Sequence, residues 1–540
     1  MNAMLDNTQI PTSAGLRSLT AIERQQRAAS MACVDATKRP GTPDCSQSLW
    51  ISLFFDGTGN NLFKDTEKSK QSNVARLYSV HPVDDESTGR YRIYINGLGT
   101  PFPEIGEKTT SPLGLGFGVG GEKRLQWART EFDKRIAKAK ARATNPKQPI
   151  RMVNVALFGF SRGAASARAF AVWLSRECKE DGGGWRYQGY PIRLYFMGLF
   201  DTVASAGLPA SAQSVDRSPV LKFAVNVISP VLGAGLAVAP KDGHYDWAKN
   251  LKIPGMVEQC IHYVAAHEVR DSFPLDSVRD GKNYPRNCVE VVYPGVHSDV
   301  GGGYAPGEQT RALQDEEKLS QVPLLHMYRA ARAAGVPLQS LENVGAKVRA
   351  SFDLSPKTQV LFDQYQRRAQ ANGPLEQAVA DHLYPLYLAR SYLSKLTNDE
   401  TARARLPKAK QVLAQTGNGD LVKDQDKELG LITAGGLAVN AATGEAETMK
   451  LNGKTLTLRE ATLARAYEDV SLITGASSEA KVLLDFFGYL VHDSVAGFGT
   501  DFSKLQNWRM MYFGDVSYVP ANDWSLSEAT VPSNDTGATV

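Results

Sequence analysis

Several features that mark other protein classes are scarce in this 540-residue sequence. The cysteines number only five, at positions 33, 45, 178, 260 and 288, and they form no C-x-x-C pair. This odd, scattered set argues against a disulfide framework and against a structural zinc site. Lys and Arg total 61 against 57 Asp and Glu, and the basic residues form no stripe. Charge therefore gives no indication of nucleic acid as a partner.

Long apolar runs are scarce as well. Residues 1–30 contain no apolar segment of the kind found in a conventional secretion signal, so we expect a chain made in the cytoplasm without a signal peptide. The nearest approach to a membrane span, 220–239, is interrupted by Lys222, Asn226 and Pro230. That interruption favours a buried hairpin or an apolar lid over a transmembrane helix. We treat 218–240 as an apolar insertion and a candidate lid.

What is present is an alternation of strand-like and helix-like segments. Hydrophobic residues make up 42% and charged residues 22%, as in ordinary globular proteins. Apolar stretches predict strands, and charged or small-residue amphipathic stretches between them predict helices at 121–143 and 161–178. The predicted strands cover 49–56, 90–97, 150–158, 190–201, 259–269 and 287–297. This order predicts an α/β protein with a mostly parallel sheet.

The composition changes after residue 310, which suggests a division of the chain. We predict an N-terminal arm over 1–48 and an α/β core over 49–310. Residues 311–520 are rich in helix formers and read as a helical cap or docking module, with predicted helices at 311–335, 360–400 and 457–497. The tail 521–540 has the polar composition of a disordered segment.

The segment "VALFGFSRGAASARAF", 155–170, places a serine between two glycines after a strand and before a helix. A strand, G-x-S-x-G and a helix together are typical of the nucleophile elbow of α/β-hydrolases. The turn at Ser161 is sharp, so Gly159 and Gly163 relieve steric crowding, and the helix N-terminus favours developing negative charge. We therefore predict an α/β-hydrolase fold with Ser161 as the nucleophile.

A serine nucleophile needs a base, and the base needs an acid that orients it. Asp201 ends the next predicted strand, where a site loop should begin, and Asp271 is an alternative acid. Among the eight histidines, His297 follows a strand in the Gly-rich loop "GVHSDVGGGY". We predict His297 as the base, with His267 and His492 as alternatives.

A second glycine-bearing turn, "FFDGTGNN" at 54–61, follows the first predicted strand. In this fold an oxyanion hole combines the N–H of the residue after the nucleophile with an N–H from a loop after an early strand. We predict Arg162 for the first donor and Gly57 or Thr58 for the second, with Asp56 holding the turn. The Gly-rich run 113–124 lacks the Lys-Ser/Thr of a phosphate-binding loop, so we expect no nucleotide cofactor.

The four segments "LFFDGTGNN", "FGFSRGAASARAF", "GLFDTVAS" and "YPGVHSDVGGGY" resemble, in this order, the first family of type VI secretion lipase effectors. The resemblance spans 49 to about 305, and "VHDSVAGF" and "RMMYFGDV" extend it to about 515. It implies a serine phospholipase of A1 or A2 type that acts on bacterial membrane glycerophospholipids. It places the nucleophile, acid and base on Ser161, Asp201 and His297.

The same resemblance implies an antibacterial effector that type VI machinery delivers into the periplasm of a target cell. It also implies a secretion spike protein and a cognate immunity protein as partners. The chemistry requires no metal or other cofactor, although the Asp-rich loops leave a calcium site open. The residues alone leave two other functions open, an esterase for small soluble esters and a non-catalytic binding module that retained the elbow.

Overall fold

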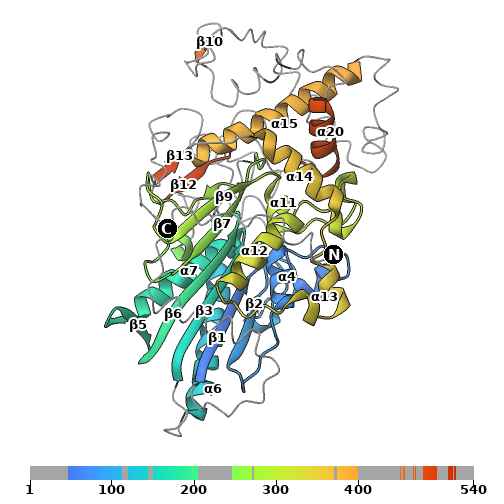
Figure 1. Cartoon of the computed structure of the whole chain (residues 1–540). Coiled ribbons are helices and arrows are strands. Elements are labelled where there is room, and N and C mark those ends of the chain that lie inside the picture. Colours follow the sequence, from blue (N-terminus) through green and yellow to red (C-terminus); the bar gives the residue numbers. More distant parts are fainter. Residues whose placement is uncertain are drawn as a thin grey trace, which may run out of the picture.

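The computed structural model describes most of the α/β region and part of the C-terminal region (Figure 1). The described residues are 47–111, 120–143, 150–204, 246–270, 273–369, 374–398, 478–494 and 509–514, with short pieces between 450 and 518. The arm up to residue 46, the insertion 218–240, the alternative acid Asp271 and the tail 521–540 lie outside them.

The main sheet has eight strands and is mixed. Neighbours along the order β2-β1-β3-β6-β7-β9 pair in parallel. Their bounds are β1 (Gln47–Phe55), β2 (Arg90–Ile95), β3 (Ile150–Phe160), β6 (Tyr190–Phe200), β7 (Cys260–Ala265) and β9 (Cys288–Tyr293).

Two short strands, β4 (Lys179–Asp181) and β5 (Gly184–Tyr187), add an antiparallel hairpin beside β6. The turn between them is formed by Gly182 and Gly183, both with positive φ, and this backbone suits a tight hairpin. The mostly parallel sheet predicted from the sequence did not include this hairpin.

The strand order reverses next to β1. The chain runs from β1 to β2 on one side, and then crosses to β3 and the later strands on the other. In α/β sheets, a ligand crevice forms outside the carboxyl ends of the strands at such a reversal. The loops after β1 and β3 therefore lie at the expected place for a functional site.

Helices cover both faces of the sheet because side chains alternate along each strand. Leu49, Ile51 and Leu53 of β1 pack in one core with α6 (Gly121–Arg142) and α7 (Arg162–Glu177). Trp50 and Phe54 of the same strand pack in a second core with α4 (Asn73–Val80) and α12 (Gln321–Ala333).

The second core continues into the C-terminal helices. Leu383 of α15 (Leu375–Asn398) and Phe486 of α20 (Ser478–Tyr489) belong to the same buried cluster as Phe158 of β3. Figure 1 shows α15 and α20 together beyond one end of the sheet. No described helix is long and apolar enough to cross a membrane.

The remaining elements are short strands, 3-10 turns and the helices not yet named. A three-stranded sheet joins β8 (Leu275–Asp276), β12 (Met511–Phe513) and β13 (Val516–Tyr518). The remaining helices and strands are α3 (Leu62–Thr66), α11 (His297–Gly301), α13 (Ala346–Ala350), α14 (Pro356–Ala369), β10 (Lys450–Leu451) and β11 (Lys454–Thr455). Helix α12 begins at Gln321, because short 3-10 turns at Glu308–Thr310 and Asp315–Glu317 occupy the start of the helix predicted at 311–335.

Candidate active site

Ser161 occupies a strained turn between β3 and α7. Its φ of 56° and ψ of −128° are unusual for a residue other than glycine. A Cβ on Gly159 would lie 2.5 Å from Ala164 Cα, and one on Gly163 would lie 2.2 Å from the Phe55 carbonyl oxygen. Larger residues at 159 or 163 would therefore collide with backbone, which is the physical reason for the G-x-S-x-G spacing.

Asp201 lies beside this turn because Phe160 and Phe200, the residues before Ser161 and Asp201, are register partners in β3 and β6. The Asp201 side chain is fully buried. Its Oδ1 accepts hydrogen bonds from Ala265 N at 2.9 Å and Arg509 Nη1 at 2.8 Å. Its Oδ2 accepts from His297 Nδ1 at 2.5 Å and Arg509 Nη2 at 2.7 Å.

These contacts keep Asp201 ionised. Burial alone would raise the pKa of the carboxyl group, but the charge of Arg509 and the hydrogen bond from His297 hold the pKa well below its usual range. An ionised Asp201 accepts at both oxygens, so the proton of the neutral His297 imidazole is on Nδ1. The His297 Nε2 lone pair is then available as a base.

Two aromatic rings hold the His297 imidazole. The Phe160 ring lies 4.6 Å from the imidazole, centroid to centroid, and the Phe273 ring lies 5.1 Å away. Gly301, at the end of α11, lets the histidine segment approach Phe160, because a Cβ there would lie 1.9 Å from that ring. Burial lowers the pKa of His297, and Asp201 opposes this shift only in part.

Within the described part of the chain, the Ser161 hydroxyl makes no hydrogen bond to His297. In ligand-free enzymes such contacts are often long and shorten only when substrate is bound.

The turn after β1 contacts the same aromatic ring. A Cβ on Gly57 would lie 2.5 Å from Phe160 Cδ1, so this loop also approaches closely. Asp56 holds the turn, as the sequence predicted: its Oδ1 accepts from Gly57 N at 2.7 Å and from Ser72 Oγ at 2.5 Å. The Gly57 N–H is thus committed to Asp56. Thr58 is the other loop residue that the sequence proposed as an oxyanion donor.

The alternative bases have other partners. His267 Nδ1 accepts from Gly295 N at 2.9 Å, and its Nε2 lies 3.0 Å from the carbonyl oxygen of His382. His492 Nδ1 donates to Asp299 Oδ1 at 2.6 Å. Of the three candidate histidines, His297 is the one paired with Asp201.

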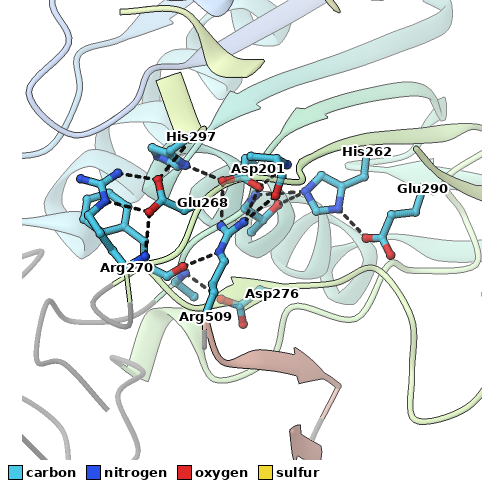
Figure 2. A network of polar contacts seen from close by, with 12 residues as sticks. Asp201, His262, Glu268, Arg270, Asp276, Glu290, His297 and Arg509 are labelled. Atoms are coloured by element: carbon cyan, nitrogen blue, oxygen red, sulfur yellow. Dashed lines mark hydrogen bonds and ion pairs between the residues drawn. The ribbon is translucent and has the colours of Figure 1, made fainter. Parts of the chain in front are cut away.

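Two further polar groups support the site (Figure 2). His262 Nε2 accepts from Thr202 N at 3.0 Å, and its Nδ1 donates to Glu290 at 2.7 Å, which fixes the backbone next to Asp201. On the other side, Glu268 accepts a 3.3 Å hydrogen bond from His297 N and pairs with Arg270. Burial would raise the pKa of Glu268, but Arg270 lowers it to about 2.

Sequence reasoning did not assign these supporting residues. Arg509 and Glu268 come from segments far from Asp201 in sequence, and neither sits in a spacing that indicates a role. The one available signal for Arg509 was its position at the start of "RMMYFGDV", which resembles the effector family. No group of His, Cys, Asp or Glu suited to a metal ion is found among the described residues.

Comparison with known proteins decides the family. The model of the family described as "T6SS, Phospholipase effector Tle1-like, catalytic domain" matches residues 50–178 and 179–330, more than half of the chain. The chain belongs to this Tle1-like family. It is thus a member of a family of type VI secretion phospholipase effectors, and Ser161, Asp201 and His297 all fall inside the matched segments. Arg509 lies outside them. No curated protein sequence matches the chain.

Among the solved structures that resemble the chain, the first supports the fold. An uncharacterized protein from Pseudomonas aeruginosa is 24% identical, with a TM-score of 0.65 over 95% of this chain and 84% of that one. A Tle1 effector bound to the VgrG spike is 20% identical, with a TM-score of 0.38 over 64% of this chain and 88% of that one. A mutant of the esterase rPPE is 16% identical, with a TM-score of 0.28 over 63% of this chain and 95% of that one.

Proposed function

We propose that this Tle1-like protein is a serine phospholipase of A type that hydrolyses an acyl ester of membrane glycerophospholipids. The observation that carries the proposal is the 2.5 Å hydrogen bond between His297 Nδ1 and Asp201, beside the strained turn at Ser161. This is the arrangement of a base, its orienting acid and a nucleophile on a strained strand-to-helix turn. Membership in a phospholipase effector family supports lipid as the substrate class.

In the proposed mechanism, His297 Nε2 takes the proton of the Ser161 hydroxyl as Ser161 Oγ attacks the acyl carbonyl carbon. Asp201 stabilises the imidazolium that forms. His297 then gives the proton to the departing lysophospholipid oxygen, and a water molecule, deprotonated by His297, releases the fatty acid from the acyl-enzyme.

We assign the oxyanion hole to the backbone N–H groups of Arg162 and Thr58. Arg162 is the first residue of α7, where the helix N-terminus favours negative charge. Thr58 takes precedence over Gly57, because the Gly57 N–H donates to Asp56. Loss of one such donor typically costs about 3 kcal/mol of transition-state stabilisation.

We also propose the α/β-hydrolase fold for the core. The elbow after β3, the histidine after β9 and the donor loop after β1 follow the order known for that fold. The division into a core at 49–310 and a C-terminal region at 311–520 stays a proposal, as does a lid role for 218–240.

For the biological setting, we propose bacterial membrane phospholipid as the target, reached by type VI secretion into the periplasm of a rival cell. We further propose binding to a secretion spike and to a cognate immunity protein. Family membership supports this setting. One structurally compared protein is a Tle1 effector bound to the VgrG spike.

The test is fatty-acid release from vesicles of phosphatidylethanolamine and phosphatidylglycerol labelled at the sn-1 or sn-2 chain. Purified protein should release one labelled chain, and Ser161→Ala should abolish the release. Release by the variant as well would refute the serine mechanism. Hydrolysis of soluble short-chain esters without release from vesicles would instead favour the small-ester esterase.

A further inference from the structure

Arg509, the 32nd residue from the end of the sequence, contacts the proposed triad through its acid. Its guanidinium binds Asp201 with both terminal nitrogens, at 2.8 and 2.7 Å, in a bidentate arrangement. The side chain is 1% exposed. Such a buried fork fixes the plane of a carboxylate, whereas a single hydrogen bond leaves it free to rotate.

A second contact ties Arg509 to the base. Its Nε donates to the carbonyl oxygen of Phe273 at 2.6 Å, and the Phe273 ring packs against the His297 imidazole. One side chain therefore connects to both members of the acid–base pair. Figure 2 shows Arg509 reaching Asp201 from below, between His297 on one side and His262 on the other.

The strand that follows Arg509 anchors it in place. Met511 and Tyr512 of β12 pair in parallel with Leu275 and Asp276 of β8. Phe513 lies under the Arg279 guanidinium at 3.6 Å from its ring centroid, and Arg279 in turn pairs with Glu376. Position 509 is thus held by backbone pairing and by a buried ion pair away from Asp201.

We propose that Arg509 is a positioning residue of the active site, so that the segment leading into the C-terminal strand β12 completes the catalytic centre formed by the family-matched segments. This inference rests on the proposed serine hydrolase function. Arg509 fixes the Asp201 carboxylate so that Oδ2 points at His297 Nδ1, and its charge offsets part of the attraction between Asp201 and a protonated His297.

The charge contribution has a definite sign. Arg509 Nη2 and His297 Nδ1 both bind Asp201 Oδ2, so the two cations of the transition state share one oxygen. The other charged groups that act on His297 are Arg270 and Glu268. Removing the Arg509 charge leaves Asp201 to stabilise the imidazolium more strongly, so the pKa of His297 should rise.

The experiment measures the rate at which a fluorophosphonate probe labels the full-length protein between pH 4 and 9. This readout needs the triad but no lipid, and Ser161→Ala identifies the labelled residue. The variants are Arg509→Met, which removes the charge, and Arg509→Lys, which keeps the charge but not the fork. Arg76→Met is the matched control, because it removes another buried arginine that binds a carboxylate, that of Asp315, with both terminal nitrogens but does not contact Asp201.

We expect Arg509→Met to label at least 10-fold more slowly and to move the acid limb of the profile up by about 1 pH unit. Arg509→Lys should label more slowly with an unmoved limb, and Arg76→Met should keep both the rate and the limb. A folded Arg509→Met with the wild-type rate and limb would overturn the inference. If Arg509→Met does not fold, a wild-type labelling rate in Arg509→Lys overturns it. Failure of the wild-type protein to label would refute the proposed function itself, and the inference with it.

Discussion

Replacing Asp201 with asparagine tests the acid at the centre of the site. The carboxylate accepts four hydrogen bonds, two on each oxygen, from His297, Ala265 and Arg509. Asparagine has the same shape but only one oxygen, so its amide NH₂ must face two donors in either orientation. If the NH₂ group faces His297, the imidazole must accept at Nδ1 and carry its proton on Nε2. That tautomer cannot deprotonate Ser161.

The expected loss is large in both activity and stability. A serine hydrolase whose triad aspartate becomes asparagine loses about 10⁴-fold in kcat through the wrong tautomer. The substitution also leaves the Arg509 guanidinium, 1% exposed, without its counter-charge. Breaking a buried ion pair in this way costs about 3–5 kcal/mol of folding free energy.

The assays are the fluorophosphonate labelling rate, the release of fatty acid from vesicles and the melting temperature. Asp315→Asn is the matched control, because Asp315 also binds a buried arginine, Arg76, through both oxygens but lies apart from the triad. It should lose stability and keep activity. The double variant Asp201→Asn/Arg509→Met should melt higher than Asp201→Asn and stay inactive. A labelling rate within 10-fold of wild type in Asp201→Asn would refute the assignment of Asp201 as the acid.

Other contacts in and near the site give three more tests. Gly163→Ala places a Cβ 2.2 Å from the Phe55 carbonyl oxygen, so it should abolish fluorophosphonate labelling and destabilise the fold by about 1–3 kcal/mol or more. In the control Gly255→Ala the new Cβ meets no atom within 4 Å, so the labelling rate and the stability should stay unchanged. Burial lowers the pKa of His297 below the ordinary histidine value of 6.5, and His297 acts as a base only when it is neutral. The labelling rate should therefore stay constant as pH falls to 6.5 and decline only below that value. A decline that begins above pH 7 would contradict this. Tyr94→Phe removes a hydrogen bond to the buried carboxylate of Asp56 and should reduce stability by about 1–3 kcal/mol, measured by denaturant unfolding; an unchanged midpoint would show that Asp56 does not depend on Tyr94.

Sequence patterns predicted the parts of the site that depend on short-range constraints. The elbow at Ser161 requires glycines at fixed offsets, because backbone approaches within the turn leave no room for a Cβ. Asp201 and His297 each follow an apolar strand, and such positions gather at one edge of an α/β sheet. The antiparallel hairpin β4–β5 was missed because its strands have only three and four residues and because β4 is entirely charged and exposed.

Tertiary structure decided the rest. The sequence left three histidines as candidate bases, and the hydrogen bond to Asp201 separates His297 from His267 and His492. The sequence also offered Gly57 and Thr58 as oxyanion donors, and the hydrogen bond from Gly57 N to Asp56 is the reason that the proposed assignment takes Thr58. The role of Arg509 could be found only from the folded structure, because an ion pair between residues far apart in sequence produces no local spacing pattern. Steric limits within a turn depend on residues that are neighbours in sequence, so the sequence shows them. Which side chains form hydrogen bonds or ion pairs across the site depends instead on which distant segments the core brings together.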